Sequence, residues 1–526
     1  MSAQDRYRYK GDDDGFGRKS STVWTVSKPS NDERHYPYNE AINLAGNGRY
    51  SIGLMATLSM AALAMAIDMF GFSVIVTGAT CDFQLDLSQT NILLSMPFVG
   101  PIAMAYPWGY IADTKGRKTS LLIAMWGSFI VSVASAFAPN WVFMAVMKFI
   151  STSFCSCAQS VTYTLLGESS SETFRDSYML IMTSVLDFSL AVYVVAAYFI
   201  LNLPFSLNFG FITFTPWRLL TLVLALPLGI SAMGMHFFYE SPKFLVNAGR
   251  TEEAIEVLKN IWYRNGGYGG KYAVKKIFLE EEGNEKHKDQ SLLQSLWDQI
   301  VPIFKPPLLT RSIQLYFLTA VIYSTNNSYF MWFPFLAEKF TSGLTSNTTD
   351  VEQIDGLCNT IVSVAANVTV HAKCSTAMEV SLVWASLAEG VSFVIVLLAI
   401  TKFARRKKLL LTIILVVSCF SAIGAVTVME NMISFILFFG LLLNELCIGF
   451  IFSYFVDLYP TSYRGMAACL GVMVARASAL GGVNILGAFM LSHCSITFYG
   501  CAAMLFCAIL VTSMLPPDKR KKEIGL

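Results

Sequence analysis

Charged residues are scarce in this chain of 526 residues: Asp, Glu, Lys and Arg make up 14% of it, whereas hydrophobic residues make up 54%. This composition excludes an ordinary soluble domain, which carries far more charge. Enzyme signatures are also missing, because the sequence has no phosphate-binding G-x-x-x-x-G-K-[ST] loop, no His/Cys cluster with metal-ligand spacing and no nucleophile elbow. We therefore expect a membrane protein without catalytic residues, cofactor, metal or nucleic-acid partner.

Apolar segments long enough to cross about 30 Å of hydrocarbon recur along the chain. The first is not a cleavable signal peptide, because about fifty mostly polar residues precede it. The sequence therefore predicts an all-α membrane protein with twelve transmembrane helices. These spans lie at 51–77, 91–111, 119–138, 141–165, 177–201, 216–238, 311–337, 378–401, 408–428, 432–456, 467–491 and 494–515.

Basic residues gather on one side of the predicted spans, in the N-terminal tail, at 115–118, in 239–310 and at 402–408. The positive-inside rule therefore places both termini in the cytosol. We predict a disordered cytosolic tail, an N-terminal six-helix bundle, a cytosolic linker with short amphipathic helices, a C-terminal six-helix bundle with one lumenal loop, and a short cytosolic tail. These parts span 1–50, 51–238, 239–310, 311–515 (with the loop at 338–377) and 516–526.

The lumenal loop carries two N-glycosylation sequons, at Asn347 and Asn367. It also contains Cys358 and Cys374, which we predict to form a disulfide in an oxidising compartment. Two free thiols remain the alternative, and Cys81 in the first outside loop is a rival partner. We expect the remaining cysteines to be buried thiols in apolar spans.

A charged loop joins the second and third predicted spans. It contains Gly109, Asp113, Gly116, Arg117 and Lys118. The glycines allow tight turns between the two helices, and the basic residues hold the loop in the cytosol. We expect Asp113 to meet the positive N-terminal end of another helix in one conformation only. The pattern resembles the G-x-x-x-D-x-x-G-R-K loop of the major facilitator superfamily.

Further stretches resemble the synaptic vesicle 2-related proteins and the synaptic vesicle glycoprotein 2 group. They are Gln159-Ser160-Val161-Thr162, Trp384-Ala385-Ser386-Leu387-Ala388-Glu389 and Asp457-Leu458-Tyr459-Pro460-Thr461. A separate stretch, Glu240-Ser241-Pro242-Lys243-Phe244-Leu245, resembles the sequence after the sixth helix of sugar and organic-ion transporters. The resemblance implies two pseudosymmetric six-helix bundles around a central cavity that opens alternately to each side. The chain departs from the superfamily at Thr401 and Ala404, where the second copy of the loop motif should carry Asp and Gly. It also departs at Lys148 and Thr152, where Arg and Gly are usual.

Ionisable residues within the spans are the main functional candidates, because a charge at the bilayer centre costs about 2.5–3.5 kcal/mol unless it faces protein or water. They are Asp68, Asp187, Glu389, Glu445, Lys148 and Arg476. Glu389 and Arg476 are at similar depth, so we expect them to pair. We prefer Glu389 to Asp68 as the proton carrier, because the one basic residue that could match Asp68 in depth within its half is Lys148, whose depth depends on the helix register. Asp68 is either a cavity carboxylate or a packing partner.

The seventh span is too polar for a lipid-facing helix, with Tyr323, Asn326 and Asn327 at its centre. Either these residues line a cavity, where transporter helices often break, or they bond neighbouring helices together. We favour the cavity.

Two functions from different classes fit the sequence. One is a secondary active transporter that moves a small organic ion by alternating access, with or without proton coupling. The alternative is a non-transporting vesicle membrane protein with a trafficking or regulatory role on a transporter scaffold. Both place the chain in the plasma membrane or an intracellular vesicle membrane.

Overall fold

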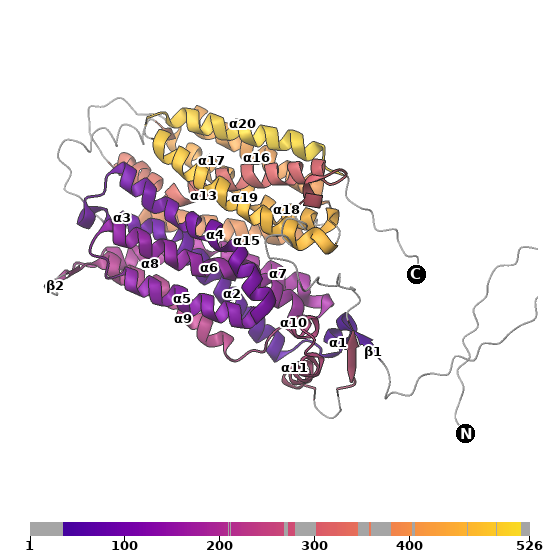
Figure 1. The fold of residues 1–526 in the computed structure, drawn as a ribbon. Coiled ribbons are helices and arrows are strands. Elements are labelled where there is room, and N and C mark those ends of the chain that lie inside the picture. The colour runs from indigo at the N-terminus through magenta and orange to yellow at the C-terminus, as the bar shows by residue number, and fades with distance from the viewer. Residues whose placement is uncertain are drawn as a thin grey trace, which may run out of the picture.

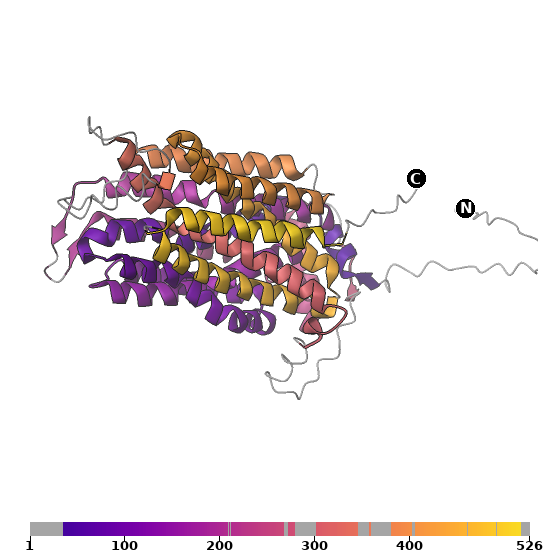
Figure 2. The same cartoon turned by 90° about the horizontal axis from the view of Figure 1, so that it is seen from above.

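The computed structural model describes residues 35–208, 210, 212–267, 272–278, 301–345, 357–358, 380–401, 406–459, 461–490 and 492–516. The axes of most helices are roughly aligned, and the helices form two bundles that lie side by side (Figures 1 and 2). One bundle comes from the first half of the chain and the other from the second half. The predicted sites Asn347, Asn367 and Cys374 fall outside the described residues.

The N-terminal bundle contains six spans, of which the first and fifth consist of two consecutive helices. Its elements are α2 (Arg49–Phe70) with α3 (Phe72–Phe83), α4 (Leu87–Lys115), α5 (Arg117–Ser135), α6 (Trp141–Ser169), α7 (Glu172–Asp187) with α8 (Ser189–Leu201), and α9 (Pro216–Met235).

The C-terminal bundle contains the other six spans, and its fourth span has a short 3₁₀ turn, η2, in its middle. Its elements are α13 (Leu309–Thr345), α15 (Val380–Thr401), α16 (Lys407–Thr427), α17 (Asn431–Leu442) with η2 (Leu443–Leu446) and α18 (Cys447–Leu458), α19 (Thr461–Phe489) and α20 (Cys494–Ser513). Ten spans are long and apolar enough to cross a membrane, and α13 and α15 supply the other two. The predicted twelve-helix fold is confirmed.

Local sequence signals explain where several helices begin and how closely they pack. Asp86 caps α4 by accepting a hydrogen bond from the Gln89 amide at 2.7 Å, and Gln89 accepts one from the Asp86 amide at 3.1 Å. Gly100 lets α4 approach α6, because a Cβ atom there would lie 2.7 Å from the carbonyl oxygen of Phe149. A side chain at this position would push the two helices apart.

Residues 35–50 are folded, although the sequence predicts a disordered tail over 1–50. Strand β1 (His35–Pro37) pairs in parallel with β4 (Lys276–Phe278), and α1 (Tyr38–Leu44) lies beside α11 (Thr251–Arg264). Asn265 joins the tail to the linker, since its amide nitrogen donates to the carbonyl of Gly46 at 3.0 Å. These contacts between distant segments join the last part of the expected tail to the linker.

The remaining described elements are short. Helix α10 (Pro242–Asn247) lies in the linker with α11, and η1 (Val301–Phe304) precedes α13. Strands β2 (Leu207–Asn208) and β3 (Thr213–Phe214) form an antiparallel pair between α8 and α9, at the end of the bundles away from α1 (Figure 1).

The predicted Cys358–Cys374 disulfide is wrong, because Cys358 pairs with Cys494 across a Cα–Cα distance of 5.6 Å. Cys494 is the first residue of α20, so it lies at a helix end beside the loop that follows α13. The sequence also placed Cys494 at the start of the last span, but it treated this cysteine as a buried thiol and did not consider it as a partner for Cys358. Cys81 is also disulfide-bonded.

Candidate functional site

The two ends of the bundles differ in their chemistry. The loop end is defined by residues 109–118 and lies on the same side as α1, α10 and α11 (Figure 1). The opposite end is defined by the start of α4 and the end of α19. Candidate functional residues occur at the loop end, in the interior of each bundle and at the opposite end.

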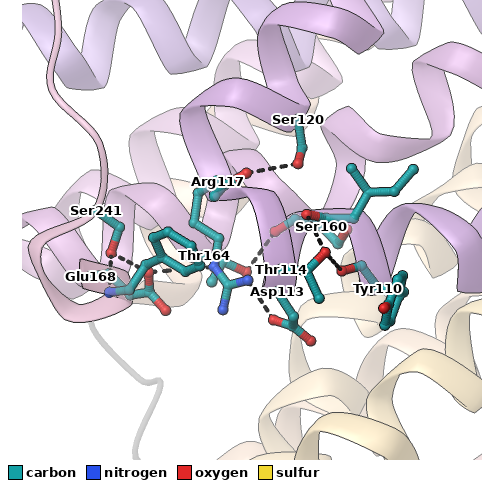
Figure 3. A network of polar contacts seen from close by, with 12 residues as sticks. Tyr110, Asp113, Thr114, Arg117, Ser120, Ser160, Thr164, Glu168 and Ser241 are labelled. Carbon is teal, nitrogen blue, oxygen red and sulfur yellow. Dashed lines mark hydrogen bonds and ion pairs between the residues drawn. The ribbon is translucent and has the colours of Figure 1, made fainter. Parts of the chain in front are cut away.

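At the loop end, Arg117 links the two helices of the motif to a third. Its guanidinium forms an ion pair with Asp113 one turn earlier, and its Nε lies 3.6 Å from a carboxylate oxygen of Glu168 on α6 (Figure 3). Ser241 donates its hydroxyl hydrogen to the Glu168 carboxylate, and Tyr38 donates to the Glu168 carbonyl. The motif is thereby tied to the folded tail and to the linker.

Burial raises the pKa of Tyr38 well above its usual range, and the nearby Glu168 carboxylate raises it further. The phenol therefore stays protonated and remains a hydrogen-bond donor at physiological pH.

The two motif glycines have different roles. Gly116 has φ +109° at the turn between α4 and α5, and a Cβ atom there would lie 2.3 Å from a carboxylate oxygen of Glu240. The same carboxylate accepts a hydrogen bond from the Lys118 amide at 2.8 Å. Gly109, in contrast, lies inside the continuous helix α4 and has open space around it. The expectation that both glycines form the turn is therefore wrong for Gly109.

The Asp113 side chain is 64% exposed and pairs with Arg117. Among the contacts of the described residues, none joins Asp113 to the end of another helix, so the expected contact stays a prediction for another conformation.

Inside the N-terminal bundle, Asp68 on α2 forms an ion pair with Lys148 on α6 at 2.9 Å. Ser132 donates to the same carboxylate at 2.9 Å, and Ser151 donates at 3.1 Å. The ammonium of Lys148 also donates to the backbone carbonyl of Asp68 and lies 5.0 Å from the Phe72 ring centroid. The pair borders a cavity with room for about one water molecule.

Lys148, the one basic residue of this half that the sequence offered as a match for Asp68, is therefore its partner. Lys148 is seven residues from the start of α6, and Asp68 is near the end of α2. Because these two helices run in opposite directions, a position early in one lies at the depth of a position late in the other. Counting residues from both helix ends would have revealed the match.

At the boundary between the bundles, Arg476 on α19 reaches α6 and α2. Its guanidinium donates to the side-chain oxygen of Gln159 and to the sulfur of Met69 at 3.2 Å. The guanidinium carbon lies 6.0 Å from the centroid of the Tyr323 ring. The predicted Glu389–Arg476 ion pair is not formed, because Arg476 is turned toward the N-terminal bundle.

Glu389 on α15 is 3% exposed, and neither carboxylate oxygen accepts a hydrogen bond from a residue that the structure describes. Glu445 on η2 lies close enough for the two negative charges to interact. Asp187 ends α7, and its side chain is outside the described part of the structure.

The seventh span is one unbroken helix, α13. Hydroxyls along α13 bond back to its own backbone, as Thr325 does to Val321 at 2.8 Å. Asn326 and Asn327 are buried, and both side-chain polar atoms of Asn326 lack a partner among the described residues. The interruption occurs instead at η2 in the tenth span, where Glu445 lies.

At the opposite end, the two bundles are joined by a set of contacts that the sequence did not predict. Asn91 on α4 donates to Asn484 on α19 at 3.1 Å, and Asn484 donates to Ser95 on α4 at 2.9 Å. A Cβ atom at Gly487 would lie 2.3 Å from the side-chain oxygen of Asn91, so the glycine permits this approach. These contacts join the two bundles at the opposite end, while the Asp113 side chain at the loop end is exposed.

Comparisons with known proteins agree with this architecture. The family model of the Major Facilitator Superfamily matches residues 58–482. The synaptic vesicle 2-related protein of Rattus norvegicus is 25% identical over 495 residues, which cover 92% of this chain and 81% of that protein. Synaptic vesicle glycoprotein 2C of Homo sapiens is 25% identical over 324 residues, covering 56% and 44%.

Among solved structures, the inward open conformation of the xylose transporter XylE from E. coli has a TM-score of 0.61 and 15% identity, with coverage of 90% of this chain and 98% of that chain. This likeness concerns the fold. The resemblance to the synaptic vesicle 2-related group is confirmed by the relatives above.

Proposed function

Because the chain belongs to the Major Facilitator Superfamily, we propose that it is a secondary active transporter that moves a small organic ion across a membrane by alternating access. The observation that carries the proposal is that two buried ionisable side chains, Glu389 and Arg476, have no ionic partner among the described residues. Buried charges without ionic partners are costly, so they are retained where an ion binds or moves. Arg476 also reaches across the boundary that must open in each transport cycle.

The contacts between the bundles support alternating access. Asn484 and Asn91 hold the opposite end together, while Asp113 is free to meet another helix at the loop end. If the termini are cytosolic, as the basic residues indicate, this conformation faces inward. Closure of the loop end would bring Asp113 to the start of α19 and separate Asn91 from Asn484.

We further propose proton coupling at Asp68, in place of Glu389, which the sequence favoured. A coupling carboxylate must exchange a cationic partner for a proton during the cycle. Asp68 has such a partner in Lys148 at 2.9 Å, together with two serine donors and a water-sized cavity. Glu389 has no cationic partner within the described residues. We therefore assign Glu389 to the substrate site.

Flux into vesicles reconstituted with purified protein tests this function. Organic cations and organic anions would be presented with and without an imposed pH gradient, and Glu252→Gln on the exposed face of α11 would serve as a charge-removal control. We expect saturable uptake of an organic ion, which the gradient increases in wild type and in the control. Asp68→Asn should lose only the gradient-driven part.

The alternative, a vesicle protein that does not transport, is supported by the names of the relatives and by Thr401 in the second motif copy. Folded, monodisperse protein that moves no member of the panel in either direction would contradict transport and favour this alternative.

A further inference from the structure

The C-terminal bundle holds two opposite charges in separate surroundings. Glu389 on α15 is 3% exposed and Arg476 on α19 is 4% exposed. Within the described part of the chain they form no ion pair with each other, and neither has an ionic partner of its own. An interior that needed only to fold would neutralise such charges or omit them.

The surroundings of Arg476 suit an anionic group. Its protein contacts are all uncharged: the Gln159 amide oxygen, the Met69 sulfur and the face of the Tyr323 ring. Its Nε hydrogen has no acceptor among the described residues. A guanidinium presents a planar fork of donors that matches a carboxylate in two places, so a carboxylate would satisfy Arg476 better than its present neighbours do.

The surroundings of Glu389 suit a cationic group. Both of its oxygens are buried and accept no hydrogen bond from any described residue. The acidic group of Glu445 also acts electrostatically on Glu389, so ionisation of both groups without a cation is unfavourable. An ammonium group near Glu389 would offset both charges.

Neutral polar groups lie on α13, which packs against both α19 and α15, and on η2, which packs against α13. Asn326 on α13 has two unpartnered side-chain atoms, and the side-chain oxygen of Asn444 on η2 is also unpartnered in the described structure. The Asn444 nitrogen donates to Thr325 of α13 at 2.8 Å, which holds η2 against α13. Each buried polar atom without a partner costs about 1–3 kcal/mol. A ligand with polar atoms along its length would recover part of that cost.

We propose that the cargo is a zwitterion: a small organic molecule with a carboxylate that binds Arg476 and an ammonium that binds Glu389. This inference rests on the transport function proposed above and specifies its substrate class. A cargo with only a positive charge leaves Arg476 unpaired, and a cargo with only a negative charge leaves Glu389 unpaired. A zwitterion pairs both without adding net charge to the protein interior.

The test uses a matched series of solutes in vesicles reconstituted with the full chain. One member is a trimethylammonium carboxylate, with spacers of different length tested in parallel. The second replaces the carboxylate by an alkyl group and is a cation, and the third replaces the ammonium by a tert-butyl group and is an anion. We expect uptake of the zwitterion, at its best spacer length, to exceed uptake of either isostere at least tenfold.

Two substitutions should change this preference in opposite directions. Arg476→Gln should lower zwitterion uptake and raise the ratio of cation to zwitterion, whereas Glu389→Gln should raise the ratio of anion to zwitterion. Arg476→Lys should restore part of the wild-type preference, because it restores the charge without the fork. Lys259→Gln and Glu252→Gln, both on exposed positions of α11, should leave all ratios unchanged.

Selectivity distinguishes failure of the inference from failure of the proposed function. Saturable uptake of only cations, only anions or only uncharged solutes by wild type would overturn the zwitterion assignment while transport itself stands. No uptake of any solute by folded wild-type protein would overturn both. If size-exclusion chromatography shows that either variant is misfolded, the uptake ratios of wild type among the matched solutes still test the zwitterion assignment.

Discussion

Replacing Asn484 by Ala should shift the protein toward the conformation that is open at the opposite end. The substitution removes the hydrogen bond from Asn91 at 3.1 Å and the bond to Ser95 at 2.9 Å. Both join α19 to α4, so they exist only while the opposite end is closed. The amide of Asn484 also donates to Leu480 in its own helix at 2.8 Å, and that loss affects both conformations equally.

The size of the shift follows from the two lost bonds between bundles. A hydrogen bond contributes about 0.5–1.5 kcal/mol net, so two contribute about 1–3 kcal/mol. This corresponds to a change of about 5- to 150-fold in the ratio of the two conformations. The shift should be large enough to measure without unfolding either bundle.

Distances between spin labels can report the change. One pair of labels at Ser88 and Ser492 spans the opposite end, and a second pair at Lys115 and Arg406 spans the loop end; all four positions are exposed. In Asn484→Ala the first distance should increase and the second should decrease. Ser478→Ala is a matched control, because its hydroxyl bonds only to the backbone of α19 in the described contacts.

Unchanged distance distributions at both ends, in protein that remains folded, would refute the role of Asn484. A change at the opposite end alone would also count against it, because alternating access requires the two ends to move in opposite senses.

Four further outcomes are expected. Asp113→Asn should favour the conformation open at the loop end several-fold, because a charge at a helix end contributes about 0.3–2 kcal/mol. Cysteine-accessibility labelling from each side of the membrane would measure this shift. Unchanged labelling would make Asp113 a structural loop residue. Asp68→Asn should retain substrate exchange but lose accumulation driven by a pH gradient, and retained accumulation would exclude Asp68 as the coupling group. Peptide mass mapping without reduction should recover Cys358 joined to Cys494. Glycosidase treatment should shift the electrophoretic mobility of wild type but not of a variant that lacks the two predicted sequons.

The sequence predicted the fold because its signals are local. Long apolar spans define the helices, and the charged loop at 109–118 indicates the superfamily and therefore its two-bundle arrangement. The turn at Gly116 and the ion pair between Asp113 and Arg117 also lie within a few residues of each other. None of these features depends on knowing where distant parts of the chain meet.

The features that the sequence missed depend on contacts between distant segments. Tyr38 bonds to the carbonyl of Glu168, 130 residues away, and this contact helps to order the last part of the expected tail. The partner of Cys358 lies 136 residues further on. Neither separation leaves a pattern in the amino-acid sequence.

Depth and direction explain the errors among the candidate site residues. Glu389 and Arg476 are at similar depth, but depth does not say which way a side chain points, and Arg476 points toward Gln159. Asn484 and Asn91 resemble ordinary polar residues within apolar spans. Only their meeting across the two bundles identifies them as a contact that opens and closes.

Cross-linking of the opposite end tests the central claim most directly, namely that the two bundles carry cargo by moving against each other. Cysteines would replace Ser95 and Asn484 and be joined by a short bifunctional maleimide in reconstituted vesicles, with each single variant and the wild type treated in the same way. We predict that the cross-linked protein loses uptake while the three treated controls keep theirs. Uptake that continues at the control rate through fully cross-linked protein would contradict the account.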